Sequence, residues 1–204
     1  FYLSGETTNP PKIQAPTPGL PEVPEAADFA ALKDTLRAGV KVVAAPKLFP
    51  TPAAVAERAV ELADLFAGCK LLEPSAGTGN LIEAAAGAGV FRSDITACEI
   101  NPTLAAGLKD KAGRVVPGDF FERNGDLGTF DRILMNPPFD HGSDIQHVRH
   151  ALKFLGEGGR LVAIVAAGPR QREAFAEYEW HDLPEDSFAN QGTGVRTAII
   201  VIDG

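Results

Sequence analysis

The sequence predicts an α/β fold in which a doubly wound, mostly parallel sheet lies between layers of helices. Short apolar stretches alternate along the chain with helical stretches of roughly 10 to 15 residues, as in the βαβ units of a parallel sheet. In residues 71–81 an apolar run breaks at Gly77 and Gly79 and then continues as an alanine-rich helix. A strand, a tight turn and a helix start in this order are typical of a βα unit.

The composition limits the number of domains and the kind of partner. With 204 residues, of which 45% are hydrophobic and 23% charged, the chain suits one sizeable core with a tail. Its net charge of −8 opposes non-specific binding to nucleic acid. Contact with a nucleic acid therefore has to come from a local basic patch, for which Arg170, Arg172 and Arg196 are the best candidates.

Features that report on the cellular compartment indicate a soluble protein. No apolar run approaches the length of a membrane span and no charged-then-apolar leader opens the chain, so we expect a cytoplasmic location and no membrane partner. The only cysteines, Cys69 and Cys98, fall in predicted buried strands. This placement is typical of reduced core residues.

Two segments precede the predicted sheet. Residues 1–25 carry six prolines, which disfavour a helix or a central strand and predict an extended tail or linker. The main domain is expected over residues 26–204. It would begin with a short amphipathic helix over residues 26–39, acting as a lid or as a partner surface.

A longer helix is expected to start at Pro52 and to reach Ala67, where Gly68 ends it. Thr51 can cap this helix, and Phe66 belongs to its inward stripe.

The remaining elements continue the alternation. Ser143 has the spacing of a capping box with Gln146, so a helix is expected to open there. Strands are predicted at the start of 71–81 and over 95–100, 114–121, 130–139, 158–168, 178–183 and 195–202, the last closing the sheet; further helices are predicted over 81–88, from Asn101 and from Pro169.

The glycine turn has the chemistry of a ligand site. Gly77 and Gly79 lack Cβ atoms, so backbone N–H groups can approach a ligand at the start of a helix. A dinucleotide fingerprint would need glycine in place of Ile82, and the acidic Glu73 argues against phosphate. A ribose or a carboxylate fits better, and Glu99, at the end of the next strand, stands where nucleoside-type folds carry a ribose-binding acid.

Two motifs together carry a family resemblance. Residues 73–79 read Glu-Pro-Ser-Ala-Gly-Thr-Gly, and residues 136–139, at the end of a later strand, read Asn-Pro-Pro-Phe. In this order they resemble the S-adenosylmethionine-dependent amino-methyltransferases, and most nearly the N6-adenine DNA methyltransferases. The resemblance spans about residues 45–203. It implies a Rossmann-like class I methyltransferase with a seven-stranded sheet whose last strand is antiparallel.

The resemblance also implies a cofactor site for S-adenosylmethionine. Phe49, Pro50 and Thr51 would lie at its methionine end, although staple and cap chemistry also explains Phe49 and Thr51. Asp119 would bind the adenine amine and Phe120 would lie against the ring; the alternative is that Asp119 caps a turn and Phe120 is a core residue. The full implied set is Phe49, Pro50, Thr51, Glu73, Pro74, Ser75, Ala76, Gly77, Gly79, Asn80, Glu99, Ile100, Asp119, Phe120 and Asn136.

The catalytic set implied by the resemblance is Asn136, Pro137, Pro138 and Phe139. An exocyclic amine is a poor nucleophile, and two acceptors can hold it with its lone pair toward the methyl group: the Asn136 side-chain carbonyl and the Pro137 backbone carbonyl. The prolines stiffen the turn, and Phe139 can stack on the target base. Taken alone, the tetrapeptide would be a rigid turn at a strand end.

Other functions remain open. Asn-Pro-Pro with an aromatic residue also serves RNA base amines and the glutamine amide of proteins, and a non-catalytic cofactor-binding or antirestriction module is a third possibility. DNA is favoured over RNA. Only Asp203 and Gly204 follow the last predicted strand, so loops or a partner subunit would recognise the target.

Histidines after the tetrapeptide could suggest a metal site. His141, Asp144, His147 and His150 lie close together in sequence, but no second cluster supports them as ligands. We expect no metal here. These side chains are predicted to be capping and surface residues, some of them at the substrate mouth.

Overall fold

The computed structural model describes residues 49–189 and 194–204. The tail predicted over residues 1–25 and the helix predicted over residues 26–39 lie outside the described residues. The described residues belong to one compact unit, Val43–Gly204.

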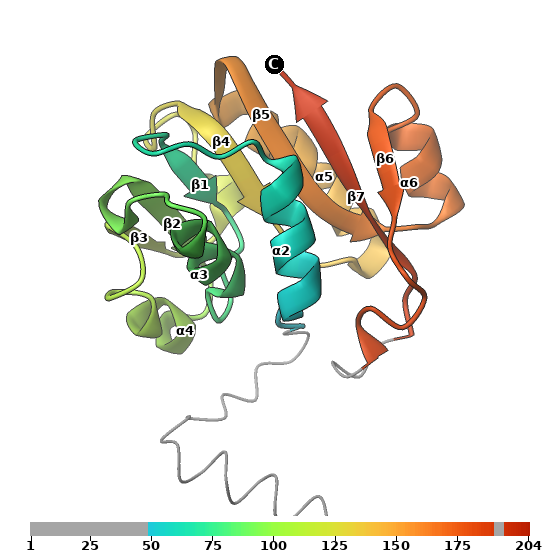
Figure 1. Ribbon diagram of the computed structural model, residues 1–204, viewed down its shortest axis with the longest axis horizontal. Coiled ribbons are helices and arrows are strands. Elements are labelled where there is room, and N and C mark those ends of the chain that lie inside the picture. Colours follow the sequence, from blue (N-terminus) through green and yellow to red (C-terminus); the bar gives the residue numbers. More distant parts are fainter. Residues whose placement is uncertain (1–48, 190–193) are drawn as a thin grey trace, which may run out of the picture. The chain divides into compact units, whose positions relative to one another are not determined.

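A seven-stranded sheet organises the described chain, in the order β3-β2-β1-β4-β5-β7-β6 (Figure 1). All neighbouring pairs are parallel except β5 with β7 and β6 with β7. The strands are β1 (Leu71–Glu73), β2 (Ile95–Glu99), β3 (Arg114–Pro117), β4 (Phe130–Met135), β5 (Leu155–Ala166), β6 (Glu179–Asp182) and β7 (Thr197–Asp203).

Helices follow most of the strands, as the alternation predicts. The α-helices are α2 (Ala53–Leu62), α3 (Asn80–Gly87), α4 (Pro102–Gly107), α5 (Ser143–Ala151) and α6 (Pro169–Ala174). Four single 3₁₀ turns complete the described elements: η1 (Arg92–Asp94), η2 (Phe120–Glu122), η3 (Asp140–Gly142) and η4 (Leu152–Phe154). The doubly wound α/β architecture is therefore confirmed.

The expected antiparallel last strand is confirmed, but it does not lie at the edge of the sheet. β7 is inserted between β5 and β6, and β6 forms the edge. The burial of the two strands explains this order. Six of the seven β7 residues are buried, so β7 needs a neighbour on each side, whereas both ends of β6 are exposed and suit an edge.

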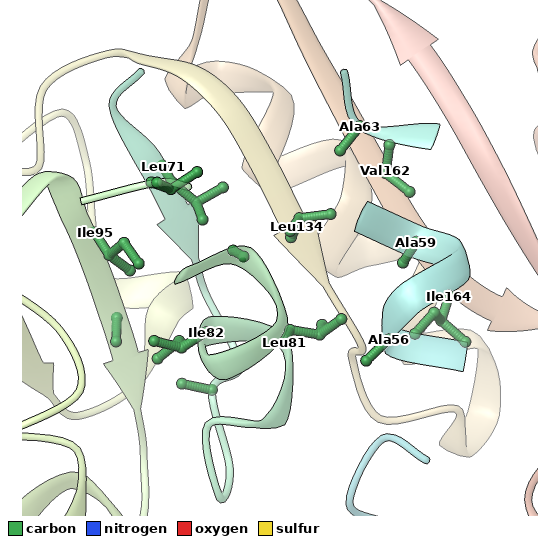
Figure 2. Close-up of a cluster of buried hydrophobic side chains, with 14 of the residues drawn as sticks. Ala56, Ala59, Ala63, Leu71, Leu81, Ile82, Ile95, Leu134, Val162 and Ile164 are labelled. Carbon is green, nitrogen blue, oxygen red and sulfur yellow. The ribbon is translucent and has the colours of Figure 1, made fainter. Parts of the chain in front are cut away.

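Two layers of apolar side chains cover the faces of the sheet. On one face, α2 and α3 place alanines and Leu81 against Leu134, Val162 and Ile164 of the central strands (Figure 2). The alternate strand residues, such as Ile133 and Leu161, point to the other face, where α5 packs. Central strands buried on both faces explain the continuous apolar runs in the sequence.

The helix predicted from Pro52 to Ala67 is shorter than expected. It ends at Leu62, and Asp64 takes a left-handed conformation with φ 49°. Arg132 on β4 stabilises this early end, because its Nε donates to the Asp64 carbonyl at 3.0 Å. The same guanidinium lies 5.0 Å from the ring centroid of Phe66, which is 49% exposed rather than inward.

The predicted helix caps are wrong at two places. Thr51 does not cap α2: Pro52 is the N-cap residue, and no side chain bonds to the helix end. At α5 the N-cap residue is Gly142, and the Ser143 hydroxyl bonds to His147 Nδ1 at 3.1 Å instead of forming a capping box. By contrast, Asn101 accepts hydrogen bonds from two backbone N–H groups at the start of α4, as expected.

Both cysteines are buried and free, as expected. Cys98 lies in β2, whereas Cys69 precedes β1 by two residues rather than lying in a strand. Burial raises the pKa of Cys98 to about 12, so its thiol stays neutral.

We predict that Gly79→Ala destabilises the fold by on the order of 2–4 kcal/mol. Gly79 has φ 82°, and a Cβ there would lie 2.8 Å from Leu108 Cδ2. The check is urea denaturation beside Gly87→Ala, in which the new methyl meets no atom within 4 Å. That control should gain about 0.5–1 kcal/mol. Equal effects in the two variants would contradict the prediction.

Candidate active site

A cavity of about 420 Å³ opens where the carboxyl ends of the parallel strands β1, β2, β3 and β4 meet. This edge is where open α/β sheets bind ligands, and the volume suits a small molecule. Residues as far apart in the sequence as Phe49 and His147 line this one cavity, because parallel strands end at the same edge of the sheet.

The cavity brings together every residue that the sequence assigns to a cofactor or catalytic site, except Gly79. The lining includes Phe49, Pro50, Thr51, Glu73, Pro74, Ser75, Ala76, Gly77, Asn80, Glu99, Ile100, Asp119, Phe120, Asn136, Pro137, Pro138 and Phe139. Gly79 instead serves as the N-cap of α3, packed under Leu108 and Lys111.

The Glu99 carboxylate joins two of the loops around the cavity. Its Oε2 accepts a hydrogen bond from the Gly77 backbone N–H, and its Oε1 accepts one from the Asn101 backbone N–H, each at 2.7 Å. Charge-assisted bonds of this length are strong and directional. Glu99 therefore holds the glycine turn after β1 against the turn after β2, and the Gly77 N–H is used within the protein.

Glu73 is an acid with one oxygen left unsatisfied. The residue is 2% exposed, and its Oε2 has no hydrogen-bond partner. Burial raises the pKa of Glu73 well above its usual value and the nearby Glu99 charge raises it further, while the Ile82 backbone N–H and Lys111 oppose them. A buried carboxyl oxygen without a partner costs stability unless a ligand pairs with it.

Asn136 presents its side-chain carbonyl in a defined orientation. Its Nδ2 donates to Thr51 Oγ1 at 3.0 Å and to the Phe49 carbonyl at 3.3 Å. The Phe49 carbonyl can only accept, so these contacts fix which end of the amide is nitrogen. Asn136 Oδ1 is left buried and without a partner, as an acceptor at the cavity wall.

Two consecutive aromatic residues, Phe120 and Phe121, line the cavity and have different surroundings. Phe120 is 4% exposed and packs in the core with Phe154 and His150, whose ring centroid lies 4.9 Å from its own. Phe121 is 37% exposed and packs against His147 in a tilted arrangement, with 4.3 Å between the ring centroids. Asp119 Oδ1 accepts from the Phe121 backbone N–H at 2.9 Å, so Asp119 caps η2 while lining the cavity.

Six further lining residues were not assigned to the site from the sequence: Thr78, Asn101, Leu104, Gly118, Phe121 and His147. His147 carries the clearest chemistry, and only its place in a predicted substrate mouth pointed to it. Its Nδ1 lies 2.8 Å from the Ser143 carbonyl. Because a carbonyl can only accept, Nδ1 is the donor, and Nε2 takes no part in this bond. Burial lowers the pKa of His147, which favours the neutral ring.

Three members of the cluster His141, Asp144, His147 and His150 have hydrogen-bond partners within the fold. Among the residues that the structure describes, no group of three His, Cys, Asp or Glu side chains could hold a metal ion. Two of the four are not surface residues: Asp144 is fully buried and His150 is 8% exposed. His150 Nε2 lies 3.0 Å from the Arg123 carbonyl, and Asp144 bonds to the end of β5, so both have structural partners.

The charges on the cavity wall favour a cationic ligand. Among the described residues that line the cavity, Glu73, Glu99 and Asp119 are acidic and only His147 is basic. A phosphate beside these acids would be unfavourable, whereas a positively charged ligand would pair with the carboxylates and would favour ionisation of Glu73, whose pKa burial raises.

Comparison with known proteins identifies the fold. No protein-family model and no curated protein matches the chain. Solved structures do match. A modification subunit of a provisionally named type I restriction enzyme from Vibrio vulnificus is 18% identical with a TM-score of 0.59, covering 89% of this chain and 50% of that one.

Two other solved structures are similar. A provisionally named class I S-adenosylmethionine-dependent methyltransferase from Listeria monocytogenes is 15% identical with a TM-score of 0.60, covering 86% of this chain and 65% of that one. A provisionally named RNA methyltransferase from Pyrococcus horikoshii is 19% identical with a TM-score of 0.57, covering 87% and 96%. The chain spans half to about two thirds of the first two proteins. It has the Rossmann-like fold of class I methyltransferases.

We predict that Glu73→Gln becomes more stable relative to the unaltered protein as pH rises from about 4.5 to 8. The folded-state pKa of Glu73 is raised, so its contribution to stability is present below the unfolded pKa and is lost as pH rises through the folded pKa. Gln cannot ionise and escapes this loss. Thermal melting of both proteins across this pH range, without ligand, measures it.

The matched control is the same substitution at the exposed Glu122, outside the cavity. A melting-temperature difference at Glu73 that does not change with pH would contradict the assignment of a buried, proton-binding acid.

Proposed function

We propose that this chain binds S-adenosylmethionine in the cavity and transfers its methyl group to the exocyclic amine of adenine in a nucleic acid, DNA in preference to RNA. The single observation that carries the proposal is Asn136 Oδ1. It is a buried acceptor without a partner, held by Thr51 and Phe49 and followed by two prolines and an aromatic residue at the end of β4.

The cavity fits the charge of the proposed cofactor. S-adenosylmethionine carries a sulfonium, an ammonium and a carboxylate, for a net positive charge, and it would supply an electrophilic methyl group. The unsatisfied Glu73 oxygen suits the ammonium. Glu99 retains acceptor capacity beyond its two backbone bonds and suits the ribose hydroxyls, and Asp119 suits the adenine amine.

Asn136 and Pro137 would act on the acceptor amine. The amine lone pair is delocalised into the base, and two carbonyl acceptors that each take one amine hydrogen favour a geometry in which the lone pair is available. Thr51 and Phe49 hold the Asn136 amide before the substrate arrives, so little reorganisation is needed. Pro137 is buried, and its fixed φ stiffens the turn that carries the second acceptor.

Phe139 would contact the target base. It lines the cavity half-buried and is supported by the buried Phe188, with 6.0 Å between ring centroids in an edge-to-face arrangement. An aromatic side chain positioned at the mouth of a site can stack on an unpaired or flipped base.

Two other functions remain as alternatives to test. The acceptor could be an RNA base or a glutamine amide, since the same groups bind any planar amine. The chain could also be a non-catalytic cofactor-binding or antirestriction module. The orientation of Asn136 argues against a non-catalytic module. Binding S-adenosylmethionine alone does not need an acceptor that is held in place at that wall of the cavity. A partner subunit that recognises the target belongs to the proposal, in line with the name of the Vibrio neighbour.

We predict methyl transfer to adenine when labelled S-adenosylmethionine is offered with single-stranded DNA, duplex DNA, RNA and protein in parallel. Unpaired DNA should react fastest, because opening a duplex costs a few kcal/mol per base. Asn136→Ala should keep cofactor binding and lose on the order of 10²–10³-fold in turnover.

Asn124→Ala, an exposed asparagine outside the cavity, is the matched control and should keep full turnover. Label in glutamine or in RNA alone would replace the proposed acceptor. Retained turnover in Asn136→Ala would remove the catalytic assignment.

We predict that Glu99→Ala weakens S-adenosylmethionine binding by about 1.5–3 kcal/mol, as expected for loss of hydrogen bonds to a charged group. Calorimetry measures the affinity, with the exposed Glu122→Ala as control. Glu99 also ties two loops, so a cofactor analogue without the ribose 2′-hydroxyl separates the two effects. If Glu99 binds the ribose, the analogue and the variant should be non-additive; full additivity would leave Glu99 with a loop role only.

A further inference from the structure

The three arginines that the sequence suggests for phosphate contact have different environments. Arg172 donates to Asp182 at 2.6 Å and lies 4.8 Å from the Trp180 ring centroid. Arg196 lies 3.8 Å from Glu185. Arg170 has no ion pair among the described residues, and it lines a groove of about 540 Å³ together with a second such arginine, Arg149.

The groove lies between α5 and α6. Its polar lining is formed by His141, Gly142, Gln146, Arg149, Arg170 and Glu173. Glu173 is the only acidic side chain there in the part of the chain that the structure describes. Two guanidinium groups facing one hollow repel each other unless an anion lies between them. The lining is thus opposite in charge to the acidic cavity.

A buried acid holds the two helices at a fixed spacing. Asp144 on α5 is fully buried; its carboxylate accepts from the Ala166 backbone N–H at 3.0 Å and from Gln171 Nε2 at 3.0 and 3.1 Å. These bonds connect the start of α5 with the end of β5 and with α6. The groove between the helices is therefore preorganised, which lowers the cost of binding a ligand.

The residues at the groove entrance leave room for Arg170. Gly142 has φ 79°, and a Cβ there would lie 3.1 Å from Arg170 Nη1, so the guanidinium lies against the glycine. His141 before it also has a left-handed conformation, with φ 53°. Such a conformation in a residue with a side chain is unfavourable and concentrates at functional sites.

The groove begins beside the proposed catalytic residues. η3, which carries His141 and Gly142, follows Phe139 directly, and α5 carries both His147 of the cavity and Arg149 of the groove. Because a helix with its side chains is about 10–12 Å across, an anion in the groove would lie roughly that far from the cavity.

We propose that this groove binds a backbone phosphate of the nucleic-acid strand whose adenine enters the cavity. The proposal rests on the proposed function and names how the substrate is held. Arginine suits phosphate because its planar fork presents several donors to the oxygens. A contact of this kind positions the strand without reading its sequence. It also lets a chain with a net charge of −8 bind a polyanion through one local basic site.

The test compares two charge-matched double variants of the full chain. Arg149→Gln with Arg170→Gln removes the groove cations. Lys109→Gln with Arg114→Gln removes two exposed cations outside both the groove and the cavity. Fluorescence anisotropy with a labelled single-stranded oligonucleotide reads binding without turnover, and calorimetry with S-adenosylmethionine reads the cavity.

The groove variant should bind the oligonucleotide more weakly, with the slope of log affinity against log salt reduced by about 0.7 for each phosphate that the protein no longer neutralises. The control should match the unaltered protein, and all three should melt alike and bind S-adenosylmethionine alike. In turnover, the KM for oligonucleotide should rise in the groove variant with little change in kcat.

Equal oligonucleotide affinity and salt slope in the two double variants would overturn the proposal, as would no binding by the unaltered protein. Competition by poly-glutamate as strong as that by an oligonucleotide of equal charge would overturn it in favour of an acidic protein partner. If methyl transfer fails while the groove variant alone loses binding, the proposed function falls and the groove stands.

Discussion

The Glu99 carboxylate makes the interaction on which the site depends. It accepts one backbone N–H from the turn after β1 and one from the turn after β2, so two loops far apart in sequence share one acceptor. This is possible because parallel strands end at the same edge of the sheet. With these turns joined, Glu73, Asp119 and the end of β4 face a common cavity.

Two buried polar groups in the cavity wall lower the stability of the fold. Glu73 keeps an unpaired buried oxygen, and Asn136 keeps a buried acceptor without a partner. Unpaired buried groups cost stability, and natural proteins have little stability to spare. Such groups are tolerated at a site where a bound ligand supplies the missing partners. Both face the same cavity, one suited to a cation and the other to an amine.

One short helix connects the two sites. α5 gives His147 to the acidic cavity and Arg149 to the basic groove, and Asp144 at its start is bonded into β5 and α6. No helix among the described residues is both long and apolar enough to cross a membrane. Opposite charges on two sides of one helix suit the proposed cationic cofactor and the proposed anionic strand, which would meet at the proposed catalytic residues.

The sequence by itself determined the alternation of strands and helices, the glycine turn, and most of the residues that line the cavity, because these depend on local periodicity and on motifs. Tertiary structure alone decided the rest. Arg132, which lies on β4, stabilises the early end of α2. β7 lies inside the sheet between β5 and β6, and Asp144 on α5 has its hydrogen-bond partners on β5 and α6. Local patterns report what a segment prefers; the partner of a buried charge, or the neighbour of a strand, depends on residues far away in the chain and is known only once the sheet is assembled.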